Sequence, residues 1–201
     1  MASDADRIVD VYRRNARAWA KERSDQGLFE AAWLDRFCSL IPAGAAVLDI
    51  GCGAAVPLAG YLIESGYDVT GADAAPEMID MCCTRFPGQK WHVADMRTLA
   101  LNRVFDGLLA WDSFFHLRHD DQRRMFPVFR KHAAPRAALM FTSGPSHGEA
   151  IGTLGGEALY HASLDPAEYR ELLDESGFET VAQLIADPDH GRRIVWLAQL
   201  R

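Results

Sequence analysis

The sequence predicts an α/β fold with a seven-stranded, mostly parallel sheet, helices on both faces and a C-terminal antiparallel hairpin. Three observations predict it. Short apolar segments of strand length alternate with amphipathic segments of helix length through the middle of the chain. A glycine-rich turn follows the first apolar segment. The last two strand candidates are joined by a connection too short for a parallel crossover.

Composition limits the classes of partner. The chain has 201 residues, 49% of them hydrophobic, which favours one domain over residues 1–201 with an ordinary core. Its 21 basic and 28 acidic residues give a net charge of −7, which argues against a nucleic-acid or anionic-membrane surface. No apolar run reaches the roughly 18 residues of a membrane span. The sequence does not fix the oligomeric state, and we expect a monomer or a homodimer.

The four cysteines, of which only Cys82 and Cys83 are adjacent, form no C-x-x-C pair. The N-terminal residues are polar and acidic, without an apolar signal core. Both observations favour a reduced, cytoplasmic protein.

The first element is an amphipathic helix over residues 4–23, followed by a second helix over 28–40. In the first helix the apolar side chains at helical spacing are Ile8, Val9, Tyr12, Ala16, Trp19 and Ala20. Pro42 and Gly44 then break the chain.

Strands and helices alternate next. The predicted strands cover residues 45–50, 67–72, 90–94, 104–110 and 137–142. The predicted helices between them cover residues 56–65, 76–86 and 120–132. Pro127 lies within the last of these and is expected to kink it or shift its start.

Residues 143–163 contain five glycines and are predicted to form an irregular excursion. A helix then begins with Asp165 as N-cap, Pro166 at its first position, and Leu164 and Tyr169 placed as a hydrophobic staple. Gly177 ends it. Strands over 178–185 and 192–200 form the hairpin. Its connection, Asp187-Pro188-Asp189-His190-Gly191, has metal-ligating side chains, but it is more simply a turn, so we expect no metal site.

The strongest motif is Asp49-x-Gly51-x-Gly53, between a strand and a helix. Glycines here let the backbone turn tightly and approach a ligand, and ligands of open α/β sheets bind at this edge. Dinucleotide enzymes share such a turn, but Val56 stands where their third glycine or alanine belongs. Asp49 is a poor neighbour for a pyrophosphate and suits a cationic ligand such as S-adenosylmethionine.

Asp73 ends the second strand, 22 positions after Gly51. A carboxylate there can accept hydrogen bonds from ribose hydroxyls, which both cofactor classes carry. The alternative is that Asp49 and Asp73 are a turn aspartate and a loop cap.

With these residues, the chain resembles the class I S-adenosylmethionine-dependent methyltransferases of small-molecule type, closely over residues 45–142 and loosely beyond. The motif at 47–53 is similar to the family's cofactor loop, Ala94-Asp95-Met96 to its adenine-flanking segment, and residues 105–116 to its fourth strand and the functional end of that strand. Ala55, Ala75 and residues 134–137 depart from the family pattern.

The resemblance implies a Rossmann-like fold divided into a helical lid (1–40), a cofactor core (45–142), an active-site excursion (143–163) and a C-terminal helix and hairpin (164–201). It also implies S-adenosyl-L-methionine as cofactor and a small-molecule acceptor with an O, N or S nucleophile. The residues expected to bind the cofactor are Tyr12, Asp49, Gly51, Gly53, Asp73, Ala74, Met78, Asp95, Met96 and Trp111.

Methyl transfer is an in-line displacement that mainly requires positioning, and a base only if the nucleophile holds its proton. His116 is the candidate base or substrate anchor, its alternative being a hydrogen-bonded cap histidine. Asp112 is the second catalytic candidate, and Trp111 can favour a sulfonium by cation–π attraction. The residues expected to bind substrate are Trp19, Phe115, His147 and Tyr160, with His161 near them in the excursion.

Two other functions remain open. A nicotinamide-dependent oxidoreductase is disfavoured by Val56 and because no tyrosine begins a Tyr-x-x-x-Lys pair. A non-catalytic S-adenosylmethionine-binding protein is opposed by the intact Asp49, Asp73 and Asp112.

Overall fold

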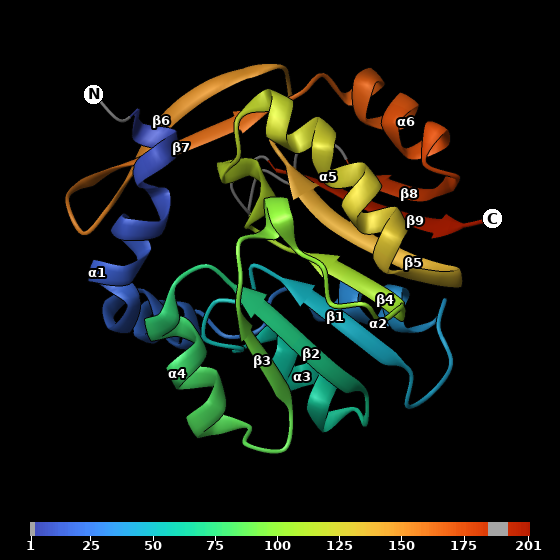
Figure 1. The fold of residues 1–201 in the computed structure, drawn as a ribbon, viewed down its shortest axis with the longest axis horizontal. Coiled ribbons are helices and arrows are strands. Elements are labelled where there is room, and N and C mark those ends of the chain that lie inside the picture. Colours follow the sequence, from blue (N-terminus) through green and yellow to red (C-terminus); the bar gives the residue numbers. More distant parts are fainter. Residues whose placement is uncertain (1–2, 185–192) are drawn as a thin grey trace.

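The computed structural model describes residues 3–184 and 193–201. A seven-stranded sheet runs through the molecule in the order β3-β2-β1-β4-β5-β9-β8 (Figure 1). Strands β1 to β5 are parallel to one another, whereas β9 is antiparallel to both of its neighbours. The fold class predicted from the sequence is confirmed.

The large sheet uses seven segments of the chain, and helices connect most of them. Its strands are β1 (Ala46–Ile50), β2 (Asp68–Asp73), β3 (Lys90–Val93), β4 (Phe105–Ala110), β5 (Ala133–Ser143), β8 (Phe178–Leu184) and β9 (Ile194–Leu200). The helices are α1 (Asp4–Asp25), α2 (Ala31–Cys38), α3 (Leu58–Glu64), α4 (Pro76–Arg85), α5 (His119–His132) and α6 (Pro166–Glu175), with short 3-10 turns η1 (Met96–Thr98) and η2 (Phe114–His116).

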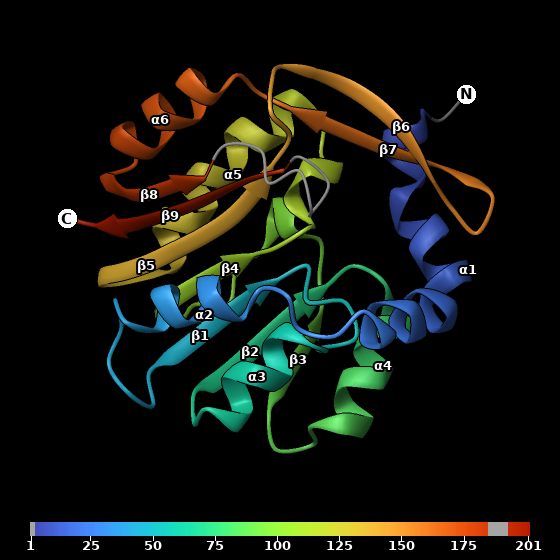
Figure 2. The same ribbon diagram turned by 180° about the vertical axis from the view of Figure 1, so that it is seen from behind.

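Helices cover both faces of the sheet, and each face has its own core (Figure 2). Successive residues of β1 belong to opposite cores. Leu48 packs with Phe129 of α5 and Leu173 of α6, whereas Val47 packs with Phe37 of α2. This alternation is the period of two that a strand buried on both faces requires.

The strand order reverses beside β1, which lies between β2 and β4. At such a switch point the loops after neighbouring strands diverge and leave a crevice at the carboxyl ends of the strands. The motif after Ile50, Asp73 at the end of β2 and Trp111 after β4 all meet there. The topology therefore places the predicted site at one edge of the sheet.

The prediction of an irregular excursion over 143–163 is wrong. This segment forms an antiparallel hairpin of β6 (Gly148–Leu154) and β7 (Glu157–Ser163). Gly155 and Gly156 turn the chain with φ of 58° and 81°, the left-handed conformation that a two-residue hairpin turn needs at both positions. The hairpin lies beside α1 in both ribbon views (Figures 1 and 2).

Several local predictions are confirmed. The Asp165 side chain caps α6 by accepting from the Ala167 N–H at 2.8 Å, and Pro166 follows it. Helix α5 begins at His119 and continues through Pro127 to His132, so Pro127 does not shift its start, and the expected kink stays a prediction. The connection at residues 187–191, with its metal alternative, lies outside the described residues. No helix in the described part of the chain is long and apolar enough to span a membrane.

Candidate active site

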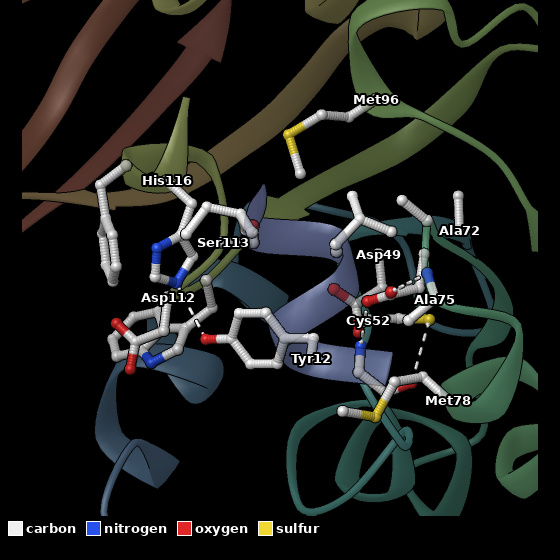
Figure 3. Close-up of a pocket in the computed structure, with 18 of the residues that line it drawn as sticks. Tyr12, Asp49, Cys52, Ala72, Ala75, Met78, Met96, Asp112, Ser113 and His116 are labelled. Carbon is white, nitrogen blue, oxygen red and sulfur yellow. Dashed lines mark hydrogen bonds between the residues drawn. The ribbon is translucent and has the colours of Figure 1, made fainter. Parts of the chain in front are cut away.

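A cavity of about 320 Å³ opens at the carboxyl ends of β1, β2 and β4. Helix α1 contributes Tyr12 to its lining (Figure 3), and strand β7 contributes His161. All ten residues expected to bind the cofactor line it, as do His116, Asp112, Trp19 and Phe115. The topology therefore brings most of the predicted site residues to one cavity.

The glycine turn is closely packed against other site residues. Gly51 has φ of +77°, and a Cβ added there would lie 2.3 Å from Cβ of Ser113. Gly53 has φ of +52°, and its Cβ would lie 2.8 Å from the Trp19 ring. No side chain fits at either position, so the backbone itself forms this wall of the cavity.

Asp49 lines the cavity from the end of β1 and is 4% exposed. Its carboxylate makes no hydrogen bond or ion pair with any described residue. Burial, followed by repulsion from the Asp73 carboxylate, raises the pKa of Asp49 to about 7. A buried carboxylate without a partner is costly, and a cationic ligand would relieve that cost.

Asp73 has a different environment, although it lines the same cavity. Its carboxylate accepts from the Gly53 N–H at 3.0 Å and from the Ala75 N–H at 2.8 Å. Burial raises its pKa, and the backbone donors partly oppose this. Asp73 thus fixes the glycine turn and also lines the cavity, and its hydrogen bond to a ribose stays a prediction. The alternative interpretation of Asp73, that it caps a loop, therefore describes part of its role.

Asp95 caps the 3-10 turn η1 and pairs with Arg97. The Arg97 N–H donates to Oδ1 at 2.9 Å, and the guanidinium approaches Oδ2 to 2.5 Å. These bonds hold the pKa of Asp95 below its usual range. The carboxylate that we expected to accept from an adenine amine therefore already has a partner.

His116 is buried, and both of its ring nitrogens have partners. Nδ1 lies 2.7 Å from the Tyr160 carbonyl oxygen, which only accepts, so Nδ1 carries the proton. Nε2 therefore accepts from the Tyr12 hydroxyl at 2.9 Å (Figure 3). Burial lowers the pKa of His116 to about 3. His116 thus has no free ring nitrogen with which to accept a proton directly, and its role as a base stays a prediction.

Asp112 follows β4 and has φ of 47°, which is rare for a residue with a side chain. Its N–H donates to Thr142 Oγ1 at 2.8 Å, and the Thr142 hydroxyl donates back to Oδ1 at 3.2 Å. Its other oxygen pairs with Arg193 at the start of β9. Burial raises the pKa of Asp112, and Arg193 opposes this.

Sequence reasoning missed the arginines that line the cavity, which are Arg23, Arg97, Arg118 and Arg193. Arg23 pairs with the buried Glu30 and donates to the Gly27 carbonyl at 2.9 Å. A signal for Arg23 was available, because it lies four positions after Trp19 on the same helix. For Arg193 the sequence offered only its place beside the last strand.

Three aromatic residues that were predicted for the site, Trp111, Trp19 and Phe115, line the cavity. Trp111 is 8% exposed, lines the cavity and leaves its buried Nε1–H without a hydrogen-bond partner within the described chain. Its cation–π role stays a prediction. Trp19 packs edge-on against Tyr12 with ring centroids 5.9 Å apart, and Phe115 lies 4.9 Å from the His116 ring.

His147 and Tyr160 are not among the described residues that line the cavity. His147 stacks on His119 with ring centroids 4.4 Å apart, and the Tyr160 hydroxyl donates to Glu149 at 2.7 Å. His161 lines the cavity instead, because successive side chains of β7 point to opposite faces. The expected substrate role of His147 and Tyr160 therefore needs correction, and its cause is the unrecognised hairpin.

Comparisons with known proteins agree with this geometry. A family model described as a methyltransferase domain matches residues 47–136. A curated relative, magnesium-protoporphyrin O-methyltransferase of Rhodobacter capsulatus, is 33% identical over 107 residues, 51% of this chain and 46% of the relative. The chain thus matches less than half the length of that relative.

Solved structures share the fold. The magnesium protoporphyrin IX methyltransferase of Synechocystis, with S-adenosylmethionine bound, has a TM-score of 0.71 at 17% identity and covers 100% of this chain and 99% of its own. An amino pentose methyltransferase of Micromonospora echinaspora, also with bound S-adenosylmethionine, has a TM-score of 0.68 at 20% identity. The match covers 85% of this chain and 89% of that chain. At this identity the similarity establishes the fold.

Proposed function

We propose that this chain, which belongs to the class I S-adenosylmethionine-dependent methyltransferases, transfers a methyl group to an O, N or S nucleophile of a small molecule. The single observation that carries the proposal is the carboxylate of Asp49, buried in the cavity with no cation among the described residues to neutralise it.

The carboxylates that line the cavity fit S-adenosylmethionine. Its ammonium and sulfonium are cationic. Within the described residues, Asp49 has no hydrogen-bond partner, and Asp73 is held by backbone N–H groups. Gly51 and Gly53 let Ser113 and Trp19 pack against the backbone of the turn, where any Cβ would clash with them. A dinucleotide would instead bring its pyrophosphate close to Asp49, which is unfavourable.

The cofactor supplies a methyl group activated on sulfur. Asp49 binds the cationic amine, and Asp73 accepts from ribose hydroxyls. Met78 and Met96 contribute apolar walls, and Asp95, held by Arg97, lies beside them. Tyr12 and Trp19 of α1 exclude water from the reacting groups, and His116 fixes the direction of the Tyr12 hydroxyl.

A small acceptor is favoured over a macromolecule. The cavity of about 320 Å³ has α1 and β7 on its outer side, and its lining includes the rings of Tyr12, Phe115, His116 and His161. The named relatives act on a porphyrin and an amino pentose, which are small molecules of different chemistry. Their acceptors are therefore a guide to the size of the acceptor rather than its identity.

The test is transfer of a radiolabelled methyl group from S-adenosylmethionine to a panel that contains an amine, a phenol, a carboxylic acid and a thiol. We expect transfer to at least one class, and loss of transfer in Asp49→Ala. Glu179→Ala, which removes an exposed carboxylate from β8, is the matched control and should keep activity. Binding of S-adenosylhomocysteine without any transfer would favour the non-catalytic alternative.

A further inference from the structure

The reaction needs a place for a proton whenever the acceptor is an alcohol, a phenol or an ammonium group. His116 cannot accept it directly, because Nδ1 donates to the Tyr160 carbonyl and Nε2 accepts from Tyr12. A proton would reach His116 through the Tyr12 hydroxyl or after that hydrogen bond is broken. A side chain that can accept the proton directly must therefore be sought elsewhere in the cavity.

Among the described residues, His161 is the other imidazole that lines the cavity. Its ring centroid lies 4.7 Å from that of His116 and 5.3 Å from that of Phe115. It is carried by β7, where it pairs with Ala150 of β6. The preceding residue, Tyr160, uses its carbonyl to hold His116. One strand thus fixes one imidazole through its backbone and presents the next through its side chain.

The neighbourhood of His161 leaves one ring nitrogen available. A Cβ on Gly152 would lie 3.1 Å from His161 Cε1, so this glycine makes room for the ring. The position of that added Cβ lies 3.6 Å from His161 Nδ1 and 3.8 Å from the Leu159 carbonyl oxygen. Burial lowers the pKa of His161, and the Leu159 carbonyl opposes this; we assign Nδ1–H as the group that faces this carbonyl. Nε2 has no hydrogen-bond partner within the described residues.

We propose that His161 Nε2 accepts the proton of the methyl acceptor. The inference rests on the proposed function. As the nucleophile forms its bond to the methyl carbon, the carbon–sulfur bond breaks and its electron pair stays on sulfur. The proton on the nucleophile moves to Nε2, and the resulting imidazolium passes it to water.

The charges around His161 are consistent with this role. Burial lowers its pKa below the ordinary value, and the Asp112 carboxylate opposes this. The groups that face it from the neighbouring elements, Tyr12 of α1 and His116 of η2, are neutral near pH 7 because burial disfavours their charged forms. His161 is therefore unprotonated at neutral pH, and Asp112 stabilises the imidazolium once it forms.

The activity test compares His161→Gln with His147→Gln, a matched change at a histidine outside the cavity. With the acceptor class that the panel identifies, we expect His161→Gln to lower kcat at least 100-fold, within the range typical of a lost general base. Its dissociation constant for S-adenosylhomocysteine should stay within about twofold of wild type. His147→Gln should keep both values. Imidazole in the buffer should restore part of the activity of His161→Ala.

The pH profile separates a base from a structural residue. Wild-type kcat should fall as the pH drops through the lowered pKa of His161, because the protonated ring cannot accept a proton. His161→Gln should lack this fall. Unchanged kcat in His161→Gln, or an acidic limb that survives the substitution, would overturn the proposal.

Nitrogen-15 NMR of the S-adenosylhomocysteine complex tests the same assignment without an acceptor. We expect His161 to carry its proton on Nδ1 and to have an unprotonated Nε2 at pH 7.5. A protonated Nε2 would overturn the proposal even if methyl transfer is observed. Failure to form the complex at all would instead contradict the proposed function.

Discussion

Asp49 and Asp73 are two carboxylates that line one cavity, yet their surroundings differ. Asp73 accepts from two backbone N–H groups, whereas Asp49 has only the neighbouring negative charge and burial acting on it. Ionisation of Asp49 is therefore unfavourable until a cation arrives. Its pKa of about 7 places this change in the neutral range.

The pKa of Asp49 predicts how the affinity for S-adenosylhomocysteine depends on pH. A cationic amine binds the ionised form of Asp49, so affinity for S-adenosylhomocysteine should rise with pH through about 7 and be lost below it. Between pH 8 and pH 6 the dissociation constant should increase on the order of tenfold, since one pH unit below the pKa leaves about a tenth of the group ionised. Calorimetry on Asp49→Asn should show weaker binding without this dependence. An identical pH profile in both proteins would contradict the role of Asp49.

Gly51 provides a test of the turn. Gly51→Ala places a Cβ 2.3 Å from Ser113 Cβ at a residue with φ of +77°. Gly27→Ala is the matched control, because Gly27 has φ of +71° and no atom within 4 Å of its Cβ position. We expect both to lose about 1–3 kcal/mol of stability from backbone strain. Only Gly51→Ala should also weaken S-adenosylhomocysteine binding, as calorimetry would show; equal affinity in the two variants would contradict this.

The elements that could be predicted are those whose pattern is local. The parallel strands, the cap of α6 and the C-terminal strand pair follow from apolar segments, Asp165-Pro166 and a short connection. The β6–β7 hairpin was missed because five glycines weakened its strand pattern. Gly155-Gly156 between two seven-residue strands is nevertheless the signal of a two-residue turn.

An ion pair and a hydrogen bond join the turn of the hairpin to α1. The Glu157 carboxylate at the hairpin turn accepts from Arg14 at 2.6 Å and from Asn15 at 3.0 Å. Tyr12 on α1 and His161 on β7 both reach the cavity, so this contact fixes the two parts of its outer wall relative to each other.

Glu157→Gln tests this contact. Because the pair with Arg14 is partly exposed, we expect global stability to change by less than about 1 kcal/mol. Hydrogen exchange in α1 and β7 should become faster, and release of S-adenosylhomocysteine should also be faster. Asp25→Asn, which breaks an exposed pair with Lys21 inside α1, is the control and should leave both rates unchanged. Equal exchange in the two variants would show that the contact does not hold the hairpin.

At the scale of the whole molecule, the sheet order fixes where the site lies. The reversal beside β1 brings the ends of three strands together, which alternation of strands and helices allowed us to predict. The pairings across the cavity could not be predicted. Tyr12 meets His116 across 104 positions, and Asp112 meets Arg193 across 81, so each contact depends on the complete packing of the chain.

The central claim is that this cavity binds S-adenosylmethionine through the two carboxylates. Titration of S-adenosylhomocysteine into the protein by calorimetry tests it most directly, with Asp73→Ala as the variant and Asp68→Ala, at the opposite end of β2, as the control. We predict 1:1 binding to wild type and to the control. In Asp73→Ala, binding should be weaker by roughly 1–3 kcal/mol, on the order of 5- to 150-fold. No binding to wild type, or equal binding to all three proteins, would contradict the account.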